Sequence, residues 1–184
     1  MSTTSNLHSK KIAFVATDGF EQSELFEPKE KLEAMGAVVE ILSIDGNSSI
    51  KGWSENNWGK SIAVDKQVED ADVGDYHGVV LPGGQINPDI LRNNTNAVEF
   101  VKAAHSADNI SVIAAICHGP WMLIEADLVR EKQIASYPSI RTDVINAGAN
   151  WNDKPVMIDG KLVTSRNPDD IPLFVEKIAE KLNS

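Results

Sequence analysis

Short apolar runs alternate with amphipathic segments along almost the whole chain. The apolar runs are rich in valine, isoleucine and alanine, as strands buried on both faces are; they occupy residues 10–17, 37–44, 77–84 and 109–116. The segments between them have the length and charge pattern of helices. This alternation predicts parallel β-α-β units, in which a central sheet is covered by helices on both faces.

The other segments are assigned by turn residues and periodicity. Residues 45–60 are rich in glycine, asparagine and serine, which predicts turns, followed by a short extended piece at 61–65. Residues 87–107 read as one helical segment capped by Asn87. Residues 155–165 contain Asp-Gly between two β-rich runs and predict a hairpin.

Length and composition narrow the class of protein. A chain of 184 residues suits one domain, which we place at residues 11–184 behind a flexible polar tail at 1–10. The tail has no apolar stretch typical of a signal peptide. A net charge of −10 without any basic cluster argues against nucleic acid and anionic membranes as partners. One cysteine makes no internal disulfide, so we expect a reducing cytoplasm.

The single cysteine stands at a corner between two predicted elements. Cys117 follows the apolar run 109–116, and His118, Gly119 and Pro120 lead into the next helix. Active sites of α/β folds lie at the carboxyl ends of the strands, and a nucleophile in such a turn is exposed at the sheet edge. Free N–H groups at the helix start should lower the pKa of this thiol. The alternative is a cysteine that packs as a small apolar side chain.

Two more strand ends add candidate residues. The turn Pro82-Gly83-Gly84 can offer a backbone N–H, so Gly84 and His118 are the predicted donors of an oxyanion hole. Glu21, in the loop after the first strand, is predicted to reach Cys117 and donate to it when protonated. The alternatives are a plain tight turn and a solvated acid at a helix start.

Four motifs resemble those of the PfpI/ThiJ family, the intracellular-protease-like branch of the class I glutamine amidotransferase-like superfamily. They are VVLPGGQINPDILR (79–92), AAICHGPWMLIEA (114–126), SYPSIRTDVINAGANW (136–151) and LVTSRNPDDIP (162–172). The resemblance covers nearly the whole chain from Lys11. It implies a flavodoxin-like three-layer α/β sandwich.

The resemblance also assigns roles to residues. It implies that Cys117 is the nucleophile, His118 its partner, Glu21 the glutamate beside the cysteine and Tyr137 a residue that lines the site. In the hexameric protease-type members an acid from a neighbouring subunit orients the histidine, and that position falls on Asp89. The protease-type pattern has Glu there, one methylene longer. We therefore expect a homodimer or hexamer with the site near a subunit interface.

Two functions follow from these residues. The first is a cysteine-dependent hydrolase of a peptide or small carbonyl substrate, either peptidase-like or deglycase-like, that acts in stress protection without a cofactor. The second is a redox-sensing stress protein or chaperone whose cysteine is oxidised with little turnover. The histidines at 8, 77, 105 and 118 lack the spacing of zinc ligands, so no metal site is predicted.

Overall fold

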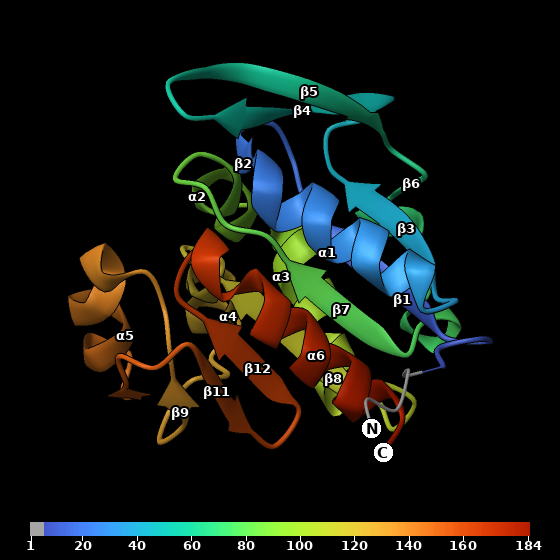
Figure 1. Ribbon diagram of the computed structural model, residues 1–184. Coiled ribbons are helices and arrows are strands. Elements are labelled where there is room, and N and C mark those ends of the chain that lie inside the picture. Colours follow the sequence, from blue (N-terminus) through green and yellow to red (C-terminus); the bar gives the residue numbers. More distant parts are fainter. Residues whose placement is uncertain (1–5) are drawn as a thin grey trace.

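A seven-stranded sheet forms the centre of the molecule in the computed structural model, which describes residues 6–184 (Figure 1). The strand order is β11-β12-β8-β7-β1-β3-β6, and every neighbouring pair is parallel except β11 with β12. The strands are β1 (Lys11–Val15), β3 (Val38–Ser43), β6 (Lys66–Gln67), β7 (Gly78–Leu81), β8 (Val112–Ile116), β11 (Val156–Asp159) and β12 (Leu162–Ser165).

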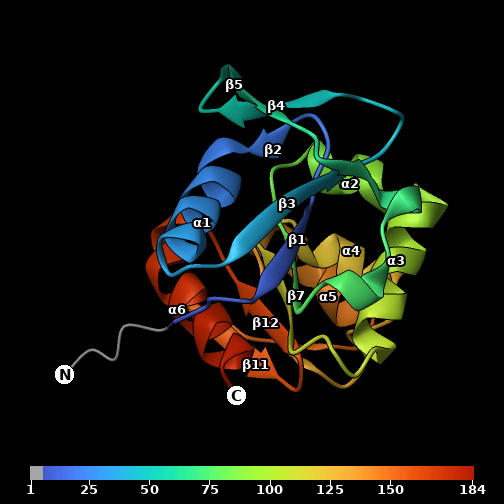
Figure 2. The ribbon, with the colours of Figure 1, turned by 90° about the vertical axis from the view of Figure 1, so that its right-hand side faces the viewer.

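Helices cover both faces of this sheet, as Figure 2 shows edge-on. One face carries α1 (Gln22–Ala34) and α6 (Ile171–Leu182). The other carries α2 (Asn87–Arg92), α3 (Thr95–Ser106), α4 (Pro120–Glu125) and α5 (Arg141–Asn146). The predicted flavodoxin-like three-layer sandwich is therefore confirmed.

Each face of the sheet has its own apolar core, because side chains alternate between the two faces of a strand. In β1, Ala13 and Val15 pack into the core under α3 and α4. Ile12 and Phe14 pack into the core under α1 and α6. All four are fully buried, which is why the strand reads as a continuous apolar run.

The side of the sheet on which successive strands are added changes at β1. From β1 the chain passes to β3 on one side, and the later strands β7, β8 and β12 add on the other side. A crevice opens at the carboxyl ends of strands at such a point. The segments that follow β1, β7 and β8 thus converge at one edge of the sheet.

A hairpin occupies most of the segment that was predicted to be turns. β4 (Ser49–Ser54) and β5 (Asn57–Ala63) pair antiparallel, and β2 (Phe20–Glu21) joins them in a second sheet. Trp53 and Trp58 stabilise the pairing through an edge-to-face contact with centroids 5.4 Å apart. The turn-rich composition obscured these strands, which lie beyond one end of the main sheet (Figure 1).

The helical segment 87–107 is two helices, and its predicted cap is wrong. Asn94 separates them and caps α3 by accepting the N–H of Ala97 at 3.0 Å. Asn87 is fully buried instead. Its side chain accepts the N–H of Thr17 at 2.8 Å and donates to the carbonyls of Pro82 and Gly83. Asn87 therefore fixes the loops after β1 and β7 to each other.

The N-terminal segment packs earlier than predicted. Leu7 is fully buried, and its N–H donates to the carbonyl of Met35 at 2.8 Å. Apolar burial of this side chain thus ties residues 6–10 to the domain, while the rest of the predicted tail, residues 1–5, lies outside the described residues.

Two short strands, β9 (Gln133–Ile134) and β10 (Asn150–Trp151), form a separate pair. No helix within residues 6–184 has both the length and the apolar character to span a membrane.

Candidate active site at Cys117

Cys117 occupies a sharp turn between β8 and α4. Its φ of +64° is unusual for a residue with a side chain. Two hydrogen bonds hold this backbone: its N–H donates to the carbonyl of Ser165 at 3.0 Å, and its carbonyl accepts the N–H of Tyr137 at 2.8 Å. A Cβ at Gly119 would lie 2.5 Å from the carbonyl oxygen of Leu81, so the turn requires glycine there. The predicted elbow geometry is present.

The backbone N–H groups of Gly84 and His118 lie beside the sulfur of Cys117 and act to lower the pKa of its thiol. Gly84 reaches this position with φ of +84°, and a Cβ on it would lie 2.6 Å from the carbonyl oxygen of Gly19. Only glycine therefore fits in this loop after β7. The structure brings together the two donors that the sequence proposed for an oxyanion hole.

His118 contacts the thiol with one ring nitrogen and a serine with the other. Nδ1 lies 3.2 Å from Sγ of Cys117, and Nε2 lies 3.1 Å from Oγ of Ser139. The ring stacks on Tyr137 at 5.1 Å and meets the edge of Trp121 at the same centroid distance. Burial lowers the pKa of His118, so the imidazole is neutral at neutral pH and can accept a proton.

The carboxyl group beside the cysteine belongs to Glu24, and the expectation that Glu21 takes this place is wrong. Glu24 is fully buried in the first turn of α1, and its Oε2 accepts the N–H of Gly83 at 2.8 Å. Burial first, and then the nearby charge of Glu21, raise the pKa of Glu24 to about 8. Glu24 is thus protonated at neutral pH.

Glu21 lies in the same cavity but further from the sulfur. It is half-buried at the N-terminus of α1, and its Oε1 accepts a hydrogen bond from Oγ of Ser23 at 3.3 Å. Burial raises its pKa as well. Glu21 belongs to β2, where it pairs with Trp53, whereas Glu24 is one of the buried residues of α1.

The expectation of a lowered thiol pKa is contradicted. Burial raises the pKa of Cys117, and a negative charge on Glu24 raises it further. The N–H groups of Gly84 and His118 act in the opposite direction without offsetting burial. The resting cysteine is therefore a thiol that needs a base, and Nδ1 of His118 is within reach of its proton.

Asp89 does not reach the site of its own chain. It lies on α2, and its Oδ1 accepts a hydrogen bond from Arg92 at 2.8 Å. The guanidinium of Arg92 stacks on Trp121 at 4.5 Å, and Trp121 contacts His118. Asp89 is thus linked to His118 only through two side chains of the same protomer.

Cys117 opens into a cavity of about 500 Å³, hereafter the cysteine cavity. Tyr137 lines it as predicted. Other lining residues were not predicted: Trp53, Glu55 and Asn56 come from the β4–β5 hairpin, Ile86 from the loop after β7, and Pro168 from the loop after β12. No described group of three or more metal-ligating side chains could hold a metal ion.

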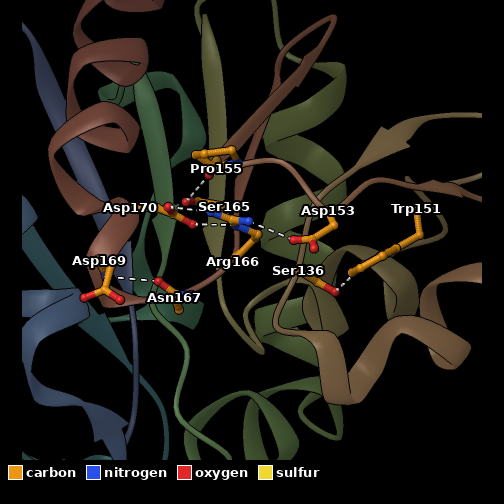
Figure 3. A network of polar contacts seen from close by, with 9 residues as sticks. All are labelled: Ser136, Trp151, Asp153, Pro155, Ser165, Arg166, Asn167, Asp169 and Asp170. Carbon is orange, nitrogen blue, oxygen red and sulfur yellow. Dashed lines mark hydrogen bonds and ion pairs between the residues drawn. The ribbon is translucent and has the colours of Figure 1, made fainter.

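An ion-pair network fixes the loop that carries Pro168 (Figure 3). Arg166 donates to both carboxylate oxygens of Asp170, at 2.9 and 3.0 Å, and to Asp153 at 2.8 Å. Ser165 donates to the carbonyl of Pro155 at 2.6 Å and also receives the N–H of Cys117 through its backbone. The same loop therefore positions the elbow and one wall of the cavity.

The sequence holds an indication of Glu24 that periodicity can recover. Glu24, Pro28 and Leu32 are spaced by four residues and are all buried, so they share one face of α1. A lone carboxyl on an apolar helix face requires a specific reason to be buried. Ser139 has no comparable indication, since it is an exposed serine in the short 3-10 helix Pro138–Ile140.

Comparison with known proteins agrees with this geometry. The sequence profile of the DJ-1/PfpI family matches residues 10–181. YraA of Bacillus subtilis, named as a candidate cysteine protease, is 40% identical over 166 residues, covering 90% of this chain and 94% of that protein. Protein/nucleic acid deglycase 2 of Escherichia coli is 36% identical over 167 residues, covering 90% and 94%.

A solved structure shows the same fold at similar identity. It is a two-domain protein of Anabaena variabilis with DJ-1/ThiJ/PfpI-like and ferritin-like domains, which superposes with a TM-score of 0.88 at 36% identity. The match covers 95% of this chain and 48% of that protein, so the chain spans about half of it. On sequence and structure alike, the chain belongs to the DJ-1/PfpI family.

Proposed function

We propose that the protein is a cysteine-dependent hydrolase that attacks a carbonyl carbon with Cys117. The observation that carries this proposal is the contact of Sγ with Nδ1 of a neutral His118 at 3.2 Å, beside the backbone N–H groups of Gly84 and His118. A thiol, a base and two donors in one cavity are the parts that acyl chemistry needs.

The first step joins sulfur to the substrate. As the S–C bond forms, the thiol proton moves to Nδ1 of His118 and the carbonyl oxygen accepts hydrogen bonds from Gly84 and His118. The protonated Glu24 adds no negative charge beside the sulfur below about pH 8. Ser139 holds the other ring nitrogen, so that Nδ1 stays directed at the thiol.

The second step depends on the substrate. With a peptide or amide, the C–N bond breaks, the leaving amine takes the proton from His118, and water hydrolyses the thioester. With methylglyoxal or its early adducts, the oxygen takes the proton and the first product is a hemithioacetal. Both substrate classes suit a family relative named as a protease and one named as a deglycase, and removal of reactive carbonyls would serve stress protection.

Product counting separates this proposal from redox sensing. Methylglyoxal consumption and cleavage of a fluorogenic peptide panel are measured side by side with wild-type protein. A hydrolase forms product in large excess over protein, in proportion to time. Cys117 oxidised once per chain by peroxide, with no product from either substrate class, would instead identify a sensor.

A further inference from the structure

Negative charge dominates the cysteine cavity. Three glutamates line it, Glu21, Glu24 and Glu55, of which Glu24 is protonated at neutral pH, and among the described residues its lining includes neither lysine nor arginine. Glu21 comes from the N-terminus of α1, and Glu55 comes from the tip of the β4–β5 hairpin. Glu21 also belongs to β2, which pairs with β4 at Trp53, so both carboxyl groups come from the part of the wall next to the hairpin.

The charge continues outward from the cavity. Glu21 and Glu55 also line a second depression between α1 and the hairpin, hereafter the acidic groove, with Glu27, Glu30 and Lys60. Lys60 is the only described basic residue in its lining, and its Nζ lies 5.8 Å from the ring centre of Phe26. A substrate that extends from Cys117 along this groove passes four carboxylates and one ammonium group.

Two observations beside the charge point to a ligand. Glu24 lines the cavity, and its Oε1 is buried without a hydrogen-bond partner among the described residues, which is uncommon for a buried polar atom. Trp53 lines the cavity, and its Nε1–H donates to the carbonyl of Glu55 at 3.0 Å. An indole ring next to a carboxylate is a favourable site for an organic cation.

We propose that the carbonyl substrate carries a positive charge, as a peptide does with lysine or arginine next to the attacked carbonyl. This deepens the proposed function and rests on it. Glu55 and Glu21 attract the cationic group, and Trp53 contacts it. Phosphate-rich or carboxylate-rich carbonyl compounds are repelled by the same residues, so a nucleic-acid substrate is disfavoured.

Charged thiol reagents test the selection without any turnover. Cys117 is the only cysteine of the chain, so its modification is read directly by intact mass. The rates are compared for three methanethiosulfonates: the cationic trimethylammonium-ethyl, the anionic sulfonato-ethyl and the neutral methyl compound. Relative to the same reagents on a neutral small thiol, we expect the cation-to-anion rate ratio to be about tenfold or more at low salt.

Substitution identifies the residues responsible. Glu55→Gln should lower the ratio by about threefold or more, because one unit charge next to the reaction path is lost. Glu99→Gln on α3 removes the same charge away from the cavity and should leave the ratio unchanged. At about 1 M salt, where the Debye length is about 3 Å, the wild-type ratio should fall toward that of the free thiol.

Each other outcome contradicts the proposal. The cavity does not select charge if the cation-to-anion rate ratio of the wild-type protein is near that of the free thiol. The same conclusion follows if Glu55→Gln and Glu99→Gln lower this ratio equally. If even the neutral reagent fails to modify Cys117, the cavity does not admit a substrate. Because the probes need no catalysis, charge selection with no hydrolysis of any substrate would contradict the hydrolase alone, and hydrolysis without charge selection would contradict this inference alone.

Discussion

Cys117 and Glu24 are a coupled pair of titrating groups in the wall of one cavity. Both are buried, and a negative charge on Glu24 raises the pKa of Cys117. Burial first, and then the charge of Glu21, raise the pKa of Glu24 to about 8, so its carboxyl group stays protonated at neutral pH. His118, neutral and 3.2 Å from the sulfur, is then the only described side chain placed to take the thiol proton.

Glu24 gives the folded state a pH dependence. Its pKa is raised from 4.5 to about 8, so between these values the folded chain binds a proton that the unfolded chain has lost, and the free energy of unfolding falls as pH rises. The slope from this group is at most about 1.4 kcal/mol per pH unit. Denaturant unfolding at several pH values should show this slope in wild-type protein relative to Glu24→Gln. Parallel curves for the two proteins would show that Glu24 keeps an ordinary pKa.

Ser139 positions His118 rather than touching the substrate. Its hydroxyl lies 3.1 Å from Nε2, so Ser139→Ala frees the ring to turn away from the thiol. We expect turnover to fall about tenfold, with the pH dependence of turnover shifted because the ring loses a hydrogen-bond partner. Ser139→Thr keeps a hydroxyl and should restore most of the activity. If Ser139→Ala and Ser139→Thr both keep the turnover of the wild-type protein, Ser139 does not position His118.

Sequence reasoning at this scale placed Cys117 in the candidate site and missed the carboxyl group beside it. Cys117, His118 and Gly84 follow from strand ends, because parallel strands end at one edge. Glu21 and Glu24 differ by three positions, and only the buried helix face that Glu24 shares with Pro28 and Leu32 distinguishes the two in the sequence. The contact of Ser139 with His118 depends on how a loop folds, which no periodicity encodes.

At the scale of elements, the loop after β7 and the turn after β8 form one backbone structure. Asn87 links the β1 and β7 loops, and Ser165 of β12 accepts the N–H of Cys117. The apolar periodicity predicted the main strands, since buried strands leave a strong pattern. It did not predict the β4–β5 hairpin, whose strands are mostly exposed or half-buried and rich in turn residues.

Gly84 and Gly160 provide a matched pair for testing the β7 loop. Both have positive φ, but a Cβ on Gly84 meets backbone atoms at 2.6 and 2.7 Å, whereas a Cβ on Gly160 meets nothing within 4 Å. Gly160→Ala should lower the free energy of unfolding by about 1 kcal/mol through backbone strain alone. Gly84→Ala should lower the free energy of unfolding by more than Gly160→Ala does. It should also slow alkylation of Cys117, because the N–H of residue 84 moves away from the sulfur. If Gly84→Ala and Gly160→Ala lose the same free energy of unfolding and the same alkylation rate, the loop after β7 has no special role at Cys117.

At the scale of the whole molecule, we propose that the chain forms a homo-oligomer whose sites lie near subunit interfaces. Asp89 is mostly exposed on α2 and points away from its own cavity, which leaves it available to a neighbour. Exposed apolar side chains on α2, α5 and the loop of the site support an interface there: Ile86, Ile90, Tyr137 and Ile145.

Mixing two inactive variants tests whether Asp89 acts across an interface. Asp89→Asn should lower turnover by about tenfold or more if its carboxylate orients the histidine of a neighbour, and Asp89→Glu should retain activity. Asp89→Asn mixed with Cys117→Ala should regain activity, because some sites then combine an intact Cys117 with an intact Asp89. Full activity of Asp89→Asn in a protein that light scattering shows to be monomeric would refute the shared site.

The nucleophilic role of Cys117 is tested most directly by the turnover of Cys117→Ala on whichever substrate the wild-type protein consumes. The variant removes only the sulfur, and its fold is checked by thermal unfolding against wild type. The proposed mechanism predicts that product formation falls to the uncatalysed background while the folded state persists. Turnover at the wild-type rate in a folded Cys117→Ala protein would contradict it.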